Sequence, residues 1–333
     1  MSASENQLPA SGEGIKQTSG RYTLLPAFER IDAHVHAYQA APTFLDLLKQ
    51  LNVRLVSICA VDKHIRGFEE LAPQHEKAAA VLRASQGRVA WVSSFDPEHW
   101  ESPDFADRVI ALANQTFDQG AVGLKIHKDV GMELKLPNGR FLMPDNPVFE
   151  SIFRAVESRN KTLYAHLAEP WACWRPLNPA SPHYVYYRAH PEWHVRLHPE
   201  FSSKESILAA RDHILERHPK LRMVECHLGS MEDNADDIAQ RLDRYPNLVV
   251  DTTARVPDLM LQPRKKVREF IVKHQDRVLY GTDLLMMPWE DAAEKAKEWE
   301  AEYARDWKFF ATDEKLVYFS CPIERFTVPE WVS

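Results

Sequence analysis

Short apolar segments alternate with longer helical patterns from about residue 29 to residue 304, and this alternation constrains the fold more than any other feature. The predicted strands span residues 29–36, 54–61, 89–95, 121–127, 162–167, 222–228, 248–253 and 277–283. The predicted helices span residues 42–51, 72–85, 105–119, 147–160, 204–218, 234–245, 263–274 and 289–304. Eight strand–helix units in succession are typical of a (β/α)8 barrel, so we expect an α/β fold of the TIM-barrel class.

The composition suits one large folded domain. A chain of 333 residues with 44% hydrophobic and 27% charged residues can bury the core that a barrel needs. No internal repeat or flexible linker follows residue 28, so we expect residues 29–333 to form a single domain. Residues 1–28 are expected to be a flexible leader, because their first part is polar and lacks the apolar segment of a secretory signal.

Charge and cysteine content argue against several classes of protein. The net charge of -7 and the pI near 6.1 argue against nucleic-acid binding, which would favour a basic face. No apolar run reaches the length of a membrane-spanning helix. The four cysteines are widely spaced without a Cys-x-x-Cys pair, which favours free thiols in a reducing cytoplasm. We therefore expect a cytoplasmic protein that acts on a small molecule, as a monomer or as a homo-oligomer.

Two predicted connections are much longer than the others. Residues 169–203, after the fifth strand, are rich in aromatic residues and prolines. A connection of this length is usually functional or disordered, and its composition argues against disorder. We therefore expect a long ordered cap, inserted after strand 5, over the mouth of a distorted barrel. Residues 128–146 follow the fourth strand, and active sites of such barrels are built from these strand-to-helix loops.

Histidines and an aspartate stand at the ends of three predicted strands. His34 and His36 lie two residues apart on the first strand, so they project from one face and could chelate one metal ion. His166 closes the fifth strand and Asp283 closes the eighth. In a closed barrel the first and eighth strands are neighbours and the fifth lies across the mouth, so the four side chains can converge. They suit one divalent metal ion, for which we expect Zn²⁺ first and Mn²⁺, Fe²⁺ or Ni²⁺ as alternatives.

Asp283 and His227 are the candidate catalytic residues. A metal at an open site lowers the pKa of its bound water to about 7, and Asp283 could both bind the metal and accept the proton of that water. His227 closes the sixth predicted strand. It could ligate a second metal, or hydrogen-bond the substrate carbonyl or the attacking water.

Lys125 and His127 share one face of the fourth predicted strand. A lysine that points into a barrel mouth is costly unless it meets an anion. Lys125 could bind a substrate carboxylate, become carbamylated and bridge two metals, or pair with Asp283 or Glu225. We favour a substrate-binding role for Lys125 and His127.

The composition of the cap predicts what it binds. Its aromatic residues could offer flat apolar surface to a substrate; they include Trp171, Trp174, Tyr184, Tyr187 and Trp193. Its arginines could bind a carboxylate with two parallel hydrogen bonds; they are Arg175, Arg188 and Arg196. We therefore expect a substrate with an anionic or aromatic group. Its expected contacts in the cap are Trp171, Arg175 and Arg188, with Arg188 preferred because it lies mid-cap among tyrosines.

Five motifs between residues 32 and 283 carry a resemblance to a known family. They are Asp32-Ala33-His34-Val35-His36, Gly123-Leu124-Lys125-Ile126-His127, His166, His227-Leu228-Gly229 and Gly281-Thr282-Asp283. With them the chain resembles the amidohydrolase superfamily, in particular the branch that includes aminocarboxymuconate-semialdehyde decarboxylase and related lactonases and hydratases. The resemblance implies a distorted barrel with one divalent metal held by His34, His36, His166 and Asp283, and an acid or base role for His227.

Residues and resemblance together predict a metal-dependent hydrolase of a small organic substrate, which cleaves an amide, lactone or ester bond with a metal-activated water. In that reaction Asp283 accepts the proton of the water and His227 stabilises the developing oxyanion. The first alternative is a metal-dependent non-oxidative decarboxylase of a small unsaturated or aromatic carboxylic acid that uses the same residues. The second is a barrel that binds a ligand without turnover.

Overall fold

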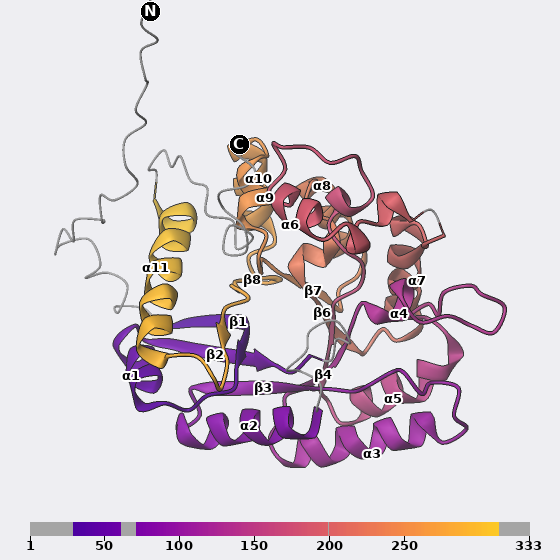
Figure 1. Ribbon diagram of the computed structural model, residues 1–333, viewed down its shortest axis with the longest axis horizontal. Helices are drawn as coiled ribbons and strands as arrows, with labels where there is room; N and C mark the ends of the chain where they lie inside the picture. Colours follow the sequence, from indigo (N-terminus) through magenta and orange to yellow (C-terminus); the bar gives the residue numbers. More distant parts are fainter. Residues whose placement is uncertain (1–28, 61–70, 199, 313–333) are drawn as a thin grey trace, which may run out of the picture.

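The computed structural model describes residues 29–60, 71–198 and 200–312 (Figure 1). The predicted leader, residues 1–28, lies outside the described residues. The strands are β1 (Arg30–Ala37), β2 (Val53–Ile58), β3 (Val89–Ser94), β4 (Gly123–Ile126), β5 (Thr162–Ala165), β6 (Arg222–Glu225), β7 (Leu248–Asp251), β8 (Val278–Leu279) and β9 (Leu285–Met286). They are all parallel and follow the order β8-β7-β6-β5-β4-β3-β2-β1-β9, which is a distorted barrel as predicted.

The helices cover the outside of this curled sheet (Figure 1). They are α1 (Pro42–Gln50), α2 (Leu71–Ala84), α3 (Phe105–Asp118), α4 (Asp129–Met132), α5 (Glu150–Ser158), α6 (Tyr184–Ala189), α7 (Lys204–Arg217), α8 (Ala235–Arg244), α9 (Val256–Met260), α10 (Arg264–Lys273) and α11 (Ala292–Ala311). Every predicted strand and helix has a counterpart, mostly within two residues at each end. The short helices α4, α6 and α9 lie in connections and were not predicted.

The segment that follows β8 closes the ring between the last and the first strand. On one side, the backbone N–H of Thr252 donates to the carbonyl of Leu279 at 2.9 Å. On the other side, the backbone N–H of Ala33 in β1 donates to the carbonyl of Tyr280 at 2.8 Å. Within two residues, this segment therefore changes from pairing with the β7 side to pairing with β1, and β9 continues the pairing along β1.

This crossing explains why the predicted strand 277–283 is divided into β8 and β9. Gly281 lies in the crossing, where a Cβ would stand 2.2 Å from Oγ1 of Thr253 and 3.0 Å from Cβ of His34. Asp283 has a φ of 70°, which no strand residue adopts. The backbone leaves strand geometry here to bring the Asp283 segment against His34.

The core has an inner and an outer part. Inside the barrel, Ile58, Val92, Tyr164 and Val224 form a small apolar cluster, with one side chain from each of four strands. The larger cluster fills the layer between the strands and the helices, where alternate strand residues point outward. Each fully buried large apolar side chain contributes about 1.5–3 kcal/mol.

The last described helix, α11, covers the β1 side of the barrel, next to α1 (Figure 1). The Trp299 ring meets the Phe44 ring edge to face, with centroids 4.9 Å apart. The Trp299 indole N–H also donates to the carbonyl of Leu285 in β9 at 3.0 Å. A third apolar cluster therefore ties α11 to the closing segment of the barrel.

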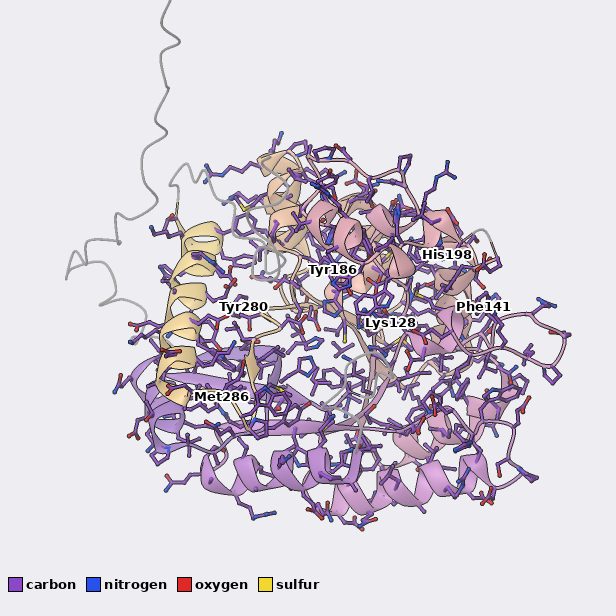
Figure 2. The ribbon with its side chains drawn as sticks, in the orientation of Figure 1. Lys128, Phe141, Tyr186, His198, Tyr280 and Met286 are labelled. Carbon is purple, nitrogen blue, oxygen red and sulfur yellow. The ribbon has the colours of Figure 1, made fainter. Side chains whose placement is uncertain are left out.

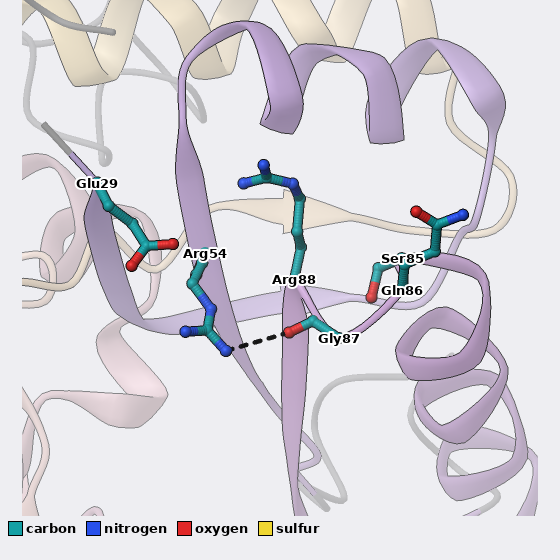
Figure 3. A pocket seen from close by; sticks show the side chains of 6 residues that line it. All are labelled: Glu29, Arg54, Ser85, Gln86, Gly87 and Arg88. Atoms are coloured by element: carbon teal, nitrogen blue, oxygen red, sulfur yellow. Dashed lines mark hydrogen bonds between the residues drawn. The ribbon is translucent and has the colours of Figure 1, made fainter. Parts of the chain in front are cut away.

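Two further observations bear on where a site can lie. None of the described helices combines the length and hydropathy needed to cross a membrane. A polar depression of about 320 Å³ lies at the N-terminal ends of β1, β2 and β3. Figure 3 shows the side chains that line it, among them Arg54, which donates to the carbonyl of Gly87. The predicted ligands lie at the opposite ends of the strands, so this depression is not part of their site.

Candidate metal centre

Three predicted ligands come together at the C-terminal ends of the strands. The donor atoms of His34, His36 and Asp283 all lie within 4.8 Å of one another. The Oδ1 atom of Asp283 lies 3.2 Å from Nε2 of His36 and 3.6 Å from Nε2 of His34. The Asp283 side chain is 32% exposed, whereas both histidines are largely buried. The group therefore opens toward solvent on the side of the carboxylate.

Backbone carbonyls orient two of the imidazoles. Nδ1 of His36 lies 2.7 Å from the carbonyl oxygen of Ile58, and Nδ1 of His227 lies 2.9 Å from that of Thr253. Because a carbonyl only accepts, each Nδ1 carries the proton and donates it. Each Nε2 then keeps its lone pair, which is the form of imidazole that binds a metal ion.

Asp251, at the end of β7, orients His34 and was not predicted as a site residue. Its Oδ2 accepts from Nδ1 of His34 at 2.9 Å, and its Oδ1 accepts from the backbone N–H of His227 at 2.8 Å. Burial acts to raise the pKa of Asp251, but the imidazole of His34 and the N–H of His227 hold it at about 2. Asp251 is therefore ionised and fixes the Nε2 lone pair of His34 toward the site.

His166 lies at the end of β5, beside His227 rather than within the group of three. Its ring centroid is 4.3 Å from that of His227, which is 5.2 Å from that of His34. Within the described residues, Nε2 of His166 and Nε2 of His34 are both buried without a hydrogen-bond partner. A buried nitrogen without a partner is costly, and a metal ion would satisfy it. The residues present therefore fit a metal ion.

His227 begins a turn with left-handed backbone. The φ angles of residues 227–230 are 58°, 57°, 60° and 55°, a conformation that residues with a side chain rarely adopt. The Ser230 hydroxyl braces the turn by donating to the carbonyl of Leu167 at 2.9 Å. Burial, with the nearby charge of Arg255, lowers the pKa of His227 to about 3, so its imidazole is neutral.

Asp283 is held as a carboxylate. Burial acts to raise its pKa, but the close contact with His36 and the imidazoles of His227 and His34 hold the pKa well below its usual value. The backbone N–H of Asp283 donates to the carbonyl of His34 at 2.9 Å. The carboxylate is thus positioned from both its backbone and its side chain.

Lys125 lies in β4, and His127 directly follows this strand. Lys125 is only 2% exposed, and none of the ion pairs among the described residues includes it. The pairing with Asp283 or Glu225 that we considered is therefore not found. His127 has its ring centroid 5.2 Å from that of His166.

The predicted substrate contacts of the cap lie nearer the surface. The Arg175 guanidinium, 55% exposed, pairs with Asp233 at 2.7 Å and lies 5.0 Å from the Trp171 ring. Arg188 is exposed on α6, 5.9 Å from the Tyr184 ring. Both arginines thus lie against aromatic rings of their own segment.

The segment between β5 and α7 is anchored to neighbouring loops. Glu169 pairs with Lys128, which follows β4 and is labelled in Figure 2, and accepts from the Tyr187 hydroxyl at 3.1 Å. Nε2 of His183 lies 2.9 Å from Oδ1 of Asp258, in α9. The described residues of this segment pack on the loops that follow β4 and β7.

Comparison with known families now decides which family the chain represents. The family model described as amidohydrolase matches residues 31–316. The chain belongs to the amidohydrolase family. This confirms the resemblance drawn from the motifs and makes the protein a metal-dependent enzyme, so a barrel without turnover is set aside. No curated protein sequence matches it significantly.

Several solved structures resemble this amidohydrolase. They include 2,6-dihydroxybenzoate decarboxylase from Rhizobium, with 15% identity, TM-score 0.47 and coverage of 82% of this chain and 92% of that chain. Another is 4-oxalomesaconate hydratase from Rhodopseudomonas palustris, with 13% identity, TM-score 0.45 and coverage of 76% of this chain and 81% of that chain. A third is 5-carboxyvanillate decarboxylase from Novosphingobium aromaticivorans, complexed with manganese, with 13% identity, TM-score 0.44 and coverage of 90% of this chain and 93% of that chain. Similarity at this level does not extend to the reaction or the substrate.

Asp251→Asn should weaken metal binding by this amidohydrolase about 10- to 100-fold, because the residue behind a histidine ligand raises its basicity and fixes its orientation. The asparagine can still accept from Nδ1 of His34 but lacks the charge. Metal affinity is measured by competition with a chromophoric chelator. Asp243→Asn is the matched control, since Asp243 is exposed and pairs with Lys273. Unchanged affinity in Asp251→Asn would contradict this role.

Proposed function

We propose that this amidohydrolase is a metal-dependent hydrolase of a small organic substrate, which cleaves an amide, lactone or ester bond beside a carbonyl group. The observation that carries the proposal is the group of His34, His36 and Asp283, with its donor atoms within 4.8 Å of one another. Further support comes from the acceptors behind both histidines, which leave each Nε2 unprotonated. Imidazoles with one carboxylate are a common ligand set for a catalytic divalent metal.

We assign one divalent metal ion to His34, His36 and Asp283, with His166 as the fourth ligand. The buried Nε2 atoms of His34 and His166, which have no hydrogen-bond partner among the described residues, support this assignment. Zn²⁺ is the ion we expect first, and Mn²⁺, Fe²⁺ and Ni²⁺ suit the same donors. When bound, such an ion supplies Lewis acidity toward a carbonyl group and toward water.

The side chains of this site would move the proton. Asp283 is the only carboxylate in the group of three, and its exposure lets it accept a proton from water and return it to the leaving group. His227 is neutral and its Nδ1–H is committed to Thr253, so its Nε2 enters the reaction as a proton acceptor. It can stabilise an oxyanion only after taking up a proton, which refines the role expected from the sequence.

A second candidate function is favoured by Lys125, namely the non-oxidative decarboxylation of a small unsaturated or aromatic carboxylic acid. The Lys125 side chain is only 2% exposed and has no carboxylate partner among the described residues. A carboxylate of the substrate would supply that partner and remove the cost of a buried unpaired charge. We therefore propose Lys125, with His127 beside it, as substrate-binding residues in either reaction.

We also propose that residues 169–203 cap the site, with Trp171 as an apolar wall for an anionic or aromatic substrate. Their anchoring to the loops after β4 and β7 supports this role. Arg175 and Arg188 remain predicted contacts of a substrate that reaches the outer face of the cap. From charge and composition we further propose a cytoplasmic enzyme, monomeric or homo-oligomeric, that does not bind nucleic acid.

A substrate screen with removal and return of metal tests the proposal. Lactones, esters, amides and aromatic carboxylates are offered to the purified protein, to the chelator-treated protein, and to that protein after addition of Zn²⁺ or Mn²⁺. We expect acid release that the chelator abolishes and the metal restores. Release of carbon dioxide would assign the decarboxylase instead. Turnover that survives complete removal of metal would contradict both functions.

A further inference from the structure

Arg255 lies in the loop that follows β7. This loop also contains Thr253, whose carbonyl orients the imidazole of His227. The backbone N–H of Arg255 donates to the carbonyl of Thr252 at 3.0 Å, which forms a tight turn with Ala254 at a φ of 53°. The carbonyl of Thr253, in the middle of this turn, accepts from Nδ1 of His227. Arg255 is only 7% exposed, and its charge acts on His227, the candidate catalytic histidine that this turn holds.

The Arg255 guanidinium makes few contacts of its own. Its Nη1 donates to the carbonyl of Ala254 at 2.9 Å, and its Nε is buried without a partner among the described residues. No carboxylate oxygen of the described residues lies within 4.0 Å of a nitrogen of the Arg255 guanidinium. A buried N–H donor without a partner is costly, and Arg255 has such a donor at Nε.

The carboxylates of the surrounding loops that act on the charge of Arg255 have partners of their own. Glu169 pairs with Lys128, and Glu232 lies 3.6 Å from Nζ of Lys204. Asp258 accepts from His183 at 2.9 Å. These carboxylates keep the environment of Arg255 negative, and their effect outweighs burial so that its pKa is raised. They keep Arg255 charged without occupying its fork of donors.

We propose that Arg255 binds a carboxylate group of the substrate beside His227. A planar guanidinium matches a carboxylate with two parallel hydrogen bonds, and this pairing is strongest where water is excluded. The position agrees with the influence of the Arg255 charge on His227. The inference rests on the proposed function in one respect, because it takes the bound anion to be part of the molecule on which the metal site acts.

A purely structural role makes a different prediction. If Arg255 serves only as a distant counterion for Glu169, Glu232 and Asp258, its loss destabilises the cap but does not distinguish a charged ligand from a neutral one. The test therefore compares two probes of the same shape, 4-fluorobenzoate and 4-fluorobenzamide, by ¹⁹F NMR titration of the full-length protein. Each titration is run on the protein as purified and after treatment with a chelator, so that binding of the carboxylate to metal is separated from binding to Arg255.

We expect Arg255→Gln to weaken 4-fluorobenzoate binding at least about tenfold, with or without metal, and to leave the weak binding of 4-fluorobenzamide unchanged. Arg154→Gln is the matched control, because it removes the same charge from an exposed arginine on α5, outside the site; it should bind both probes as the wild type does. Arg255→Lys keeps the charge but loses the fork, so it should fold and still bind 4-fluorobenzoate more weakly than the wild type.

Three results would overturn the proposal. They are wild-type affinity for 4-fluorobenzoate in the Arg255 variants, equal losses for both probes, and equal losses in Arg154→Gln. If Arg255→Gln does not fold, Arg255→Lys decides in the same way. Metal analysis separates this inference from the proposed function. Arg255-dependent binding in a protein that never holds metal would refute the metal-dependent function alone, and metal-dependent turnover without Arg255-dependent binding would refute the inference alone.

Discussion

Asp283→Asn should remove nearly all turnover while leaving the fold and most of the bound metal in place. The amide can still ligate weakly, but it cannot accept a proton. Proton transfer by a positioned base is worth about 100- to 10,000-fold, so kcat should fall by that factor. Asparagine is a suitable replacement because the backbone has a φ of 70° at this residue, a region that asparagine tolerates well.

The control for this variant is Asp276→Asn, which makes the same change at an exposed residue just before β8. Its kcat should equal that of the wild type. Metal content is measured on the same samples, so that a loss of rate is not confused with a loss of metal. If Asp283→Asn retained metal and most of its kcat, Asp283 would be a ligand only, and the proton would have to be accepted by another group, with His227 the nearest candidate.

His34→Ala should lower metal affinity more than about 100-fold, beyond the 10- to 100-fold that loss of an outer hydrogen-bond partner costs. His34 is fully buried, and it brings together Asp251 behind it and Asp283 in front. Its removal therefore takes away a donor and leaves the Asp251 carboxylate without its imidazole partner. Elemental analysis after gel filtration should find about one metal per chain in the wild type and a small fraction of that in the variant.

The cavity that His34→Ala creates calls for a matched control. His75, on α2, is also buried, and its Nε2 accepts from the backbone N–H of Ser94 at 3.2 Å. His75→Ala opens a cavity of the same kind on the outer side of the barrel, far along the chain from the ligands. It should lose stability but keep its metal. Equal loss of metal in both variants would mean that general destabilisation, and not ligation by His34, governs the metal content.

The fold could be predicted because local pattern and tertiary structure agree almost everywhere. Alternating apolar residues in strands and the 3.6-residue period in helices report which faces are buried, and the barrel buries those faces. The eighth strand is the exception. Its division around Gly281 depends on the close approach of His34 and Thr253, which no local pattern encodes.

The ligands of the candidate site could be predicted for a related reason. Polar residues at the ends of parallel strands meet at one rim of a barrel, so His34, His36 and Asp283 could be grouped from their positions alone. The same argument applied to the seventh strand would have found Asp251, which ends an apolar run. Arg255 could not be found in this way, because its burial, and the distance that separates it from every described carboxylate, arise from the packing of loops distant in sequence. For the same reason, the content of arginine in the cap did not reveal that Arg175 is exposed and paired with Asp233.

An anomalous difference map from crystals grown with Mn²⁺ or Zn²⁺ tests the central claim most directly. We predict one strong peak per chain, at about 2.0–2.2 Å from Nε2 of His34, Nε2 of His36 and a carboxylate oxygen of Asp283, with His166 completing the set. Data on both sides of the absorption edge identify the element. A peak bound by other residues, or no peak in crystals of protein that turns over substrate, would contradict the claim.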